Sequence, residues 1–284
     1  MASAKEIRGQ IKAVQNTAKI TKAMELVAAS KMKRAQDNVL AARAYSEGIH
    51  SVIANLMKAH PEFKHPFLVE REEVKRVGLL IISTDKGLCG GLNSNSFRMT
   101  LAKKKDIQAE VEALSIGKRG GLFMNRIGVH LAGSSENIPD SPDLSDILGV
   151  VELAMKQYME GHFDEVYLIY SEFVNTMTQQ PTYTRLLPCP VPEKQEGAYW
   201  DYIYEPEAKD VLEGILRRYV ESLVYHGVLE NKACEQSARM VAMKSATDNA
   251  KDIVKELSIT YNKARQAAIT QELAEICAGA AAAQ

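Results

Sequence analysis

The first 58 residues carry one continuous apolar repeat and contain no proline. Read in alternating steps of four and three, twelve of fifteen positions are apolar. A 3.5-residue repeat of this length indicates the seam of a left-handed coiled coil rather than a short core helix. The positions are Ile7, Ile11, Val14, Ala18, Thr21, Glu25, Ala28, Met32, Ala35, Val39, Ala42, Ser46, Ile49, Ile53 and Leu56. The sequence therefore predicts a helix over 1–58, closed by Pro61 and Pro66.

A second repeat of the same kind lies near the end of the chain. No proline follows Pro206, and the steps of three and four that start at Met240 are apolar at eight of nine positions. The segment 206–284 is therefore predicted to be a second long helix. Two helices with one apolar seam each bury both seams most simply by winding around each other, antiparallel.

The chain between these helices has a different character. Short apolar runs at 77–83, 111–116 and 165–170 indicate buried parallel strands. A further run at 182–187 precedes a proline-rich stretch and suits an edge strand. Helical patterns over 92–105, 119–126 and 144–159 alternate with the runs, which predicts a small α/β domain over 70–205.

The predicted fold class is thus α/β. A small, mostly parallel sheet with flanking helices is inserted between two long terminal helices, and these form an antiparallel left-handed coiled coil. The 284 residues are 46% hydrophobic and 25% charged with a net charge of −1, which excludes disordered, collagen-like and disulfide-scaffold classes. No apolar run approaches the ~18 residues of a membrane span. Four widely spaced cysteines fit reduced thiols in the cytosol, and the N-terminal segment predicts neither a secretory signal nor a transit peptide.

A glycine-rich loop at 83–93 is the motif that most resembles a binding site. It follows a predicted strand and precedes a predicted helix, a place where backbone N–H groups can hold phosphate. The glycines at 87, 90 and 91 do not fit G-x-G-x-x-G, and no Gly-Lys-Ser/Thr follows. We expect a tight strand-to-helix turn, with nucleotide binding as the alternative, and a buried rather than reactive Cys89.

No catalytic or metal-binding constellation is recognisable in the sequence. The six histidines are scattered, and Asp140, Asp143 and Asp146 lie where acids stabilise a helix start, without the spacing of a calcium loop. We therefore predict no catalytic residue, no metal and no cofactor. Residues 1–45 hold nine basic and three acidic side chains, so the N-terminal helix is basic. A solvated face or an acidic protein partner explains this better than nucleic acid, because no aromatic side chains interleave.

Several segments spread over the whole chain carry a family resemblance. They are 4–8, 15–24, 27–32, 83–93, 200–206, 235–249 and 264–273. They resemble the gamma chains of F-type ATP synthases, of bacterial type, most specifically at both ends of the chain.

The resemblance implies a rotor without an active site of its own. In that family the terminal helices form a shaft inside a ring of alpha and beta chains, and the globular part binds the epsilon chain and the membrane c ring. Ion flow turns the ring and shaft, which drives the alpha/beta catalytic sites through their conformations for ATP synthesis or hydrolysis. It further implies regulation of ATPase activity and ion flow, and a peripheral location at the cytoplasmic face of the bacterial inner membrane. Neither nucleic acid nor a small-molecule substrate is implied.

The resemblance also suggests two sets of contact residues. Contacts between rotor and stator are expected at Met24, Arg239, Arg265, Gln266 and Thr270. Contacts of the foot with the c ring or epsilon chain are expected at Tyr202, Tyr204 and Glu205.

Two other classes of protein stay open on the residues alone. One is an α/β nucleotide- or phosphate-binding enzyme with a coiled-coil arm, which would bind nucleotide at Gly87–Gly91. The other is a coiled-coil scaffold, which would tolerate surface changes over 264–273.

Overall fold

The computed structural model describes residues 4–59, 65–190 and 208–282. The chain divides into two compact units: Ala29–Arg239, and Met1–Ala28 together with Met240–Gln284. The long helices α1 (Ala4–Ala59) and α5 (Ala208–Ala282) each contribute to both units.

The larger unit is built on a five-stranded sheet with strand order β3-β2-β1-β4-β5. The strands are β1 (Arg76–Ile82), β2 (Glu110–Ile116), β3 (His130–Ser135), β4 (Glu165–Phe173) and β5 (Gln179–Leu187). β1 to β4 are mutually parallel, and β5 pairs antiparallel with β4 at the edge. The apolar runs of β1 and β2 are buried because helices cover both faces of the sheet.

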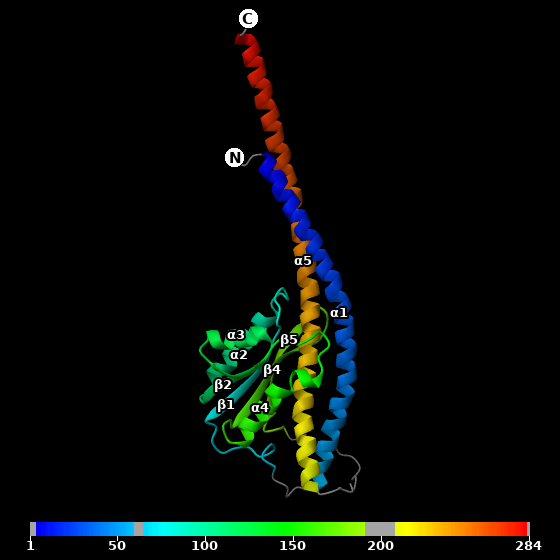
Figure 1. The fold of residues 1–284 in the computed structure, drawn as a ribbon, viewed down its shortest axis with the longest axis vertical. Coiled ribbons are helices and arrows are strands. Elements are labelled where there is room, and N and C mark those ends of the chain that lie inside the picture. Colours follow the sequence, from blue (N-terminus) through cyan, green and yellow to red (C-terminus); the bar gives the residue numbers. More distant parts are fainter. Residues whose placement is uncertain (1–3, 60–64, 191–207, 283–284) are drawn as a thin grey trace. The chain divides into compact units, whose positions relative to one another are not determined.

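Alternate side chains of β1 enter two different cores. Leu79 and Ile81 face α2 (Leu92–Asp106) and α3 (Lys118–Arg126), where Met124 lies in the same cluster. Leu80 and Ile82 face α4 (Leu148–Met159) and the first half of α5. Figure 1 shows these layers, with α1 and α5 side by side within the larger unit. Helix α5 is therefore part of the core of the α/β domain.

Within this unit α1 and α5 pack through small apolar side chains. Ala35 and Val39 of α1 contact Leu229 and Ala233 of α5 in one buried cluster. In the smaller unit the two helices bury a seam of their own, which includes Ile7, Ala28, Met243, Thr247 and Ala250. The hydroxyls of Thr21 and Thr247 lie 2.7 Å apart across that seam. The apolar repeats read from the sequence are therefore the packed faces of the two helices.

The structure confirms the predicted fold class: a mostly parallel sheet, flanking helices, and long terminal helices that pack together. Strand β3 was not predicted, because His130–Ser135 contains glycine and serine instead of an apolar run. The helix predicted over 144–159 is divided into a 3-10 turn, η1 (Leu144–Asp146), and α4. Among the helices that the structure describes, none has the length and apolarity of a membrane span.

Candidate functional site

The glycine-rich loop after β1 closes on itself. The side chain of Asn93 donates to the Thr84 hydroxyl at 2.7 Å and accepts from the Thr84 backbone N–H at 3.3 Å. The Thr84 hydroxyl donates to the carbonyl oxygen of Lys86 at 2.7 Å. These bonds make the tight strand-to-helix turn that the glycine spacing predicts, and they use polar groups that a phosphate would otherwise need.

The same loop also supplies the partners for the start of α3. The Asp85 carboxylate accepts from the backbone N–H of Lys118 at 2.9 Å, and the Ser83 hydroxyl accepts from that of Gly120 at 2.7 Å. A helix N-terminus is a natural anion site, because its first N–H groups have no partner within the helix. Here the carboxylate of Asp85 occupies that position.

Helix α5 fills the crevice beyond the carboxyl ends of β1 and β4. In open α/β sheets, ligands bind in this crevice, where the strand order reverses. Cys89 and Leu92 pack there against Cys234 and Ala238 of α5, with Phe173 at the edge of the cluster. Burial raises the pKa of the Cys89 thiol, so this cysteine is a packed, protonated side chain as expected. The crevice that the nucleotide-binding alternative requires is thus occupied by protein.

Arg239 connects α5 to the glycine-rich loop. Its guanidinium donates to the carbonyl oxygen of Gly87 at 3.2 Å and to the Glu235 carboxylate at 2.7 Å. The side chains of Arg239 and Glu235 are 11% and 5% exposed. A second cation, Lys232, lies 3.7 Å from the other oxygen of Glu235. The resemblance suggests Arg239 as a stator contact, and that stays a prediction; the structure shows its guanidinium bonded within the chain.

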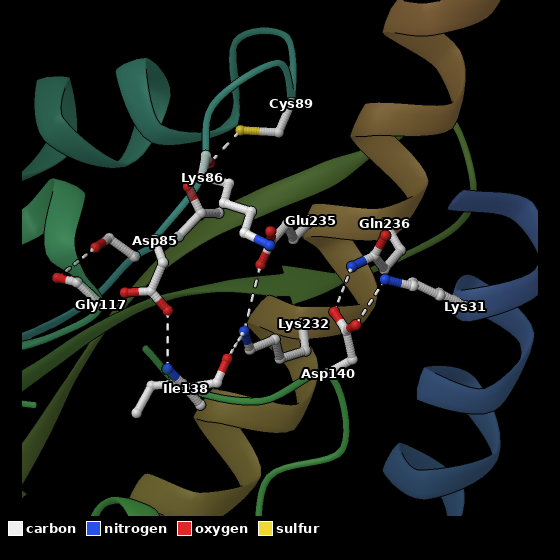
Figure 2. A network of polar contacts seen from close by, with 12 residues as sticks. Lys31, Asp85, Lys86, Cys89, Gly117, Ile138, Asp140, Lys232, Glu235 and Gln236 are labelled. Atoms are coloured by element: carbon white, nitrogen blue, oxygen red, sulfur yellow. Dashed lines mark hydrogen bonds and ion pairs between the residues drawn. The ribbon is translucent and has the colours of Figure 1, made fainter. Parts of the chain in front are cut away.

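A polar network surrounds residues 137–142, which connect β3 to η1 (Figure 2). Asp140 forms an ion pair with Lys31 of α1 at 2.7 Å and accepts from the Gln236 side chain of α5 at 3.3 Å. Asp143 and Asp146 instead form a capping box at η1, which confirms the expected helix-start role for those two acids. The sequence predicted the same helix-start role for Asp140. In the structure Asp140 instead contacts α1 and α5.

The other proposed rotor–stator residues lie in the smaller unit. Met24 is half-buried, whereas Arg265, Gln266 and Thr270 are exposed. The Thr270 hydroxyl donates to the carbonyl oxygen of Gln266 at 2.9 Å, within the same helix. Both residues lie on the exposed surface of α5. The proposed foot residues Tyr202, Tyr204 and Glu205 lie outside the described residues.

The last part of α5 has an apolar side without a covering segment in the described chain. The buried and half-buried seam positions end at Ala264, and residues 265–280 are all exposed. Ile269, Leu273 and Ile276 are 48%, 57% and 67% exposed. Their spacing of three and four places them on one face of the helix. These three side chains therefore form an exposed apolar stripe on the last part of α5.

The described residues contain no group of three or more His, Cys, Asp or Glu side chains placed to hold a metal ion. The residues that sequence analysis missed are Lys31, Gln236 and Lys232. Lys31 was counted in the basic helix, but no local pattern indicated that it pairs with an acid more than a hundred positions away.

Comparisons with known proteins agree with this architecture. The model of a protein family described as ATP synthase matches residues 3–283. An ATP synthase gamma chain of Thiobacillus denitrificans is 54% identical over 99% of this chain and 100% of its own length. A gamma chain of Legionella pneumophila is 51% identical with the same coverage. An α/β domain inserted between two long helices that pack together is the class of protein that the fold defines. This chain belongs to the ATP synthase gamma-chain family.

Solved structures share the fold. A chain from the mitochondrial ATP synthase of Euglena gracilis superposes with a TM-score of 0.70 at 16% identity, covering 98% of this chain and 94% of that one. A chain from the central stalk and c ring of the Tetrahymena thermophila enzyme gives a TM-score of 0.64 at 26% identity, covering 80% and 99%.

Proposed function

We propose that the chain is the central rotor shaft of an F-type ATP synthase. It would couple ion flow through the membrane c ring to conformational cycling of the alpha/beta catalytic sites, in either direction of the ATP reaction. Its partners would be the alpha, beta and epsilon chains and the c ring, which would hold it at the cytoplasmic face of the bacterial inner membrane. It would carry no active site, cofactor or small-molecule substrate.

The observation that carries this proposal is the exposed end of α5. A helix face that holds Ile269, Leu273 and Ile276 would be unfavourable to leave in water, since each apolar side chain gains ~1.5–3 kcal/mol on full burial. A partner that surrounds the helix would bury this face. Arg265, Gln266 and Thr270 on the same stretch would then supply polar contacts that differ between rotary angles.

Coupling requires that each rotor orientation change the conformational equilibrium of a catalytic site through differential contacts. Charge-assisted hydrogen bonds from Arg265 suit this task, because they are strong and directional. Met24 would contribute at the level of the α1 seam, and Arg239 through its hold on the glycine-rich loop. By the same contacts the shaft would regulate ATPase activity and ion flow.

The test is ATP hydrolysis by purified alpha and beta chains with and without this chain, followed by gel filtration. The rotor proposal expects multi-site turnover and co-elution only when the chain is present. Nucleotide binding by the chain alone, without association, would support the enzyme alternative. Association without any change in turnover would support the scaffold alternative.

A further inference from the structure

Residues 137–142 form a bridging segment that contacts the loop after β1, α1 and α5 within the larger unit. Its beginning is held by Asp85, whose carboxylate accepts from the backbone N–H groups of Asn137 at 3.1 Å and Ile138 at 2.9 Å. Lys232 of α5 also holds Ile138, because its ammonium group donates to the carbonyl oxygen of that residue at 2.8 Å. The bridging segment is therefore fixed to both the β1 loop and α5.

The carboxylate of Asp140 divides its two oxygens between the two helices. One oxygen accepts from Lys31 of α1 at 2.7 Å, and the other accepts from Gln236 of α5 at 3.3 Å. Figure 2 shows Asp140 pointing between these two side chains. The hydrogen bond from Lys31 lowers the pKa of Asp140, so the carboxylate is charged at neutral pH.

Aliphatic side chains form the packing between α1 and α5 beside Asp140. Ala35 and Val39 of α1 contact Leu229 and Ala233 of α5 there. Farther along, α1 and α5 border a pocket of about 590 Å³ that Ala42, Ser222 and Leu229 help to line. Apolar contact is non-directional, whereas a hydrogen bond fixes both the distance and the direction between its two groups. Directional bonds at Asp140 therefore supply what this part of the seam lacks.

We propose that Asp140 is a positioning residue of the rotor, which fixes α1 and α5 in register and ties both to the α/β domain. This inference rests on the proposed function. Torque that enters through the α/β domain reaches α5 through a broad core, whereas α1 receives it through fewer contacts: Ile49, the cluster of Ala35 and Val39, and Asp140. Without the carboxylate, α1 would shift against α5 under load, and part of each rotation step would be lost.

The test uses the complete membrane-bound complex and measures ion pumping per ATP hydrolysed. Asp140→Ala is expected to lower this ratio by about twofold, at the low end of the coupling effects seen for residues between two sites. Thermal unfolding of the chain should hardly change, because the Asp140 and Lys31 side chains are 53% and 42% exposed. Glu136→Ala, an exposed acid four positions earlier, is the matched control and should leave the ratio unchanged.

A double-mutant cycle separates the bridge from a direct stator contact by Lys31. If Lys31 acts through Asp140, Lys31→Ala lowers the ratio in the wild-type chain and has no further effect in Asp140→Ala. Equal losses in both backgrounds would overturn the proposal, as would wild-type pumping by Asp140→Ala. Failure of the wild-type chain to assemble or pump would refute the rotor function itself, before any variant is compared.

Discussion

Arg239 of α5 donates a hydrogen bond to the carbonyl oxygen of Gly87 at 3.2 Å, across 152 positions of sequence. The glycine-rich loop is thereby fastened to the long helix instead of standing open to a ligand. The same guanidinium neutralises Glu235, which is almost fully buried.

Arg239→Ala should destabilise the isolated chain by about 2–4 kcal/mol, because it leaves the Glu235 carboxylate buried with only the more distant Lys232 nearby. Urea denaturation followed by circular dichroism measures the loss. Lys244→Ala, which alters an exposed cation on the same helix, should change the free energy of unfolding by less than about 0.5 kcal/mol. Equal effects of both substitutions would show that the buried pair contributes nothing.

Gly117→Ala should cost about 3 kcal/mol or more, because the backbone there has φ +94° and a Cβ would lie 2.2 Å from the Ser83 carbonyl oxygen. Gly128→Ala is the matched control: φ is +73°, but no atom lies within 4 Å of its Cβ position. It should cost only about 1 kcal/mol. If the thermal unfolding midpoints of Gly117→Ala and Gly128→Ala were equal, this explanation from backbone geometry would be wrong.

Asp164 should make stability depend on acid pH. Burial alone would raise its pKa, but backbone N–H groups of Arg76 and Lys75 and the guanidinium of Arg71 lower the pKa below the ordinary value of 3.8. A lowered folded-state pKa means that the stabilisation is present above pH 3.8 and lost as pH falls through the lower value. Asp164→Asn should therefore lose about 1–3 kcal/mol at pH 7 and approach the wild type in acid.

The matched control for that measurement is Glu73→Gln. The ion pair of Glu73 with Lys75 is exposed on both sides and is expected to contribute little. Urea titrations at several pH values compare the three proteins. If Asp164→Asn kept the acid slope of the wild type, the slope would have to come from other carboxylates.

Replacing both Arg265 and Gln266 by Ala should leave folding unchanged and alter coupling. Both side chains are exposed, so the free energy of unfolding should shift by less than about 0.5 kcal/mol. Ion pumping and ATPase rate are then measured in the reconstituted complex, with Lys263→Ala as an exposed control on the same helix. If ion pumping and ATPase rate both stayed at their wild-type values, Arg265 and Gln266 would not form the proposed stator contact. That result would favour the coiled-coil scaffold alternative.

Met24→Lys should weaken coupling more than folding. Met24 is half-buried, so a lysine can keep its stem on the seam while its ammonium group reaches solvent and pairs with acidic stator groups. Pumping per ATP is the measurement, and Met24→Leu controls for loss of the thioether. A ratio equal to that of wild type would disprove this explanation.

Much of the fold could be predicted because it follows from local periodicity. The buried α1 positions Ile7, Ala28, Ala35 and Val39 all belong to the 3.5-residue repeat. The apolar run of β1 was equally visible. Strand β3 was missed because its pairing with β2 depends on the neighbour rather than on its own residues.

The sequence alone determined two helical seams and a parallel sheet between them, since side-chain periods of 3.5 and short apolar runs are properties of neighbouring residues. Tertiary structure alone decided that Cys234 fills the crevice beside Cys89, and that Asp140 lies between Lys31 and Gln236. These residues are far apart along the chain, and no local pattern encodes which of them meet. Their contacts exist because α5 packs at once on the sheet and on α1, and that packing is a cooperative property of the whole core.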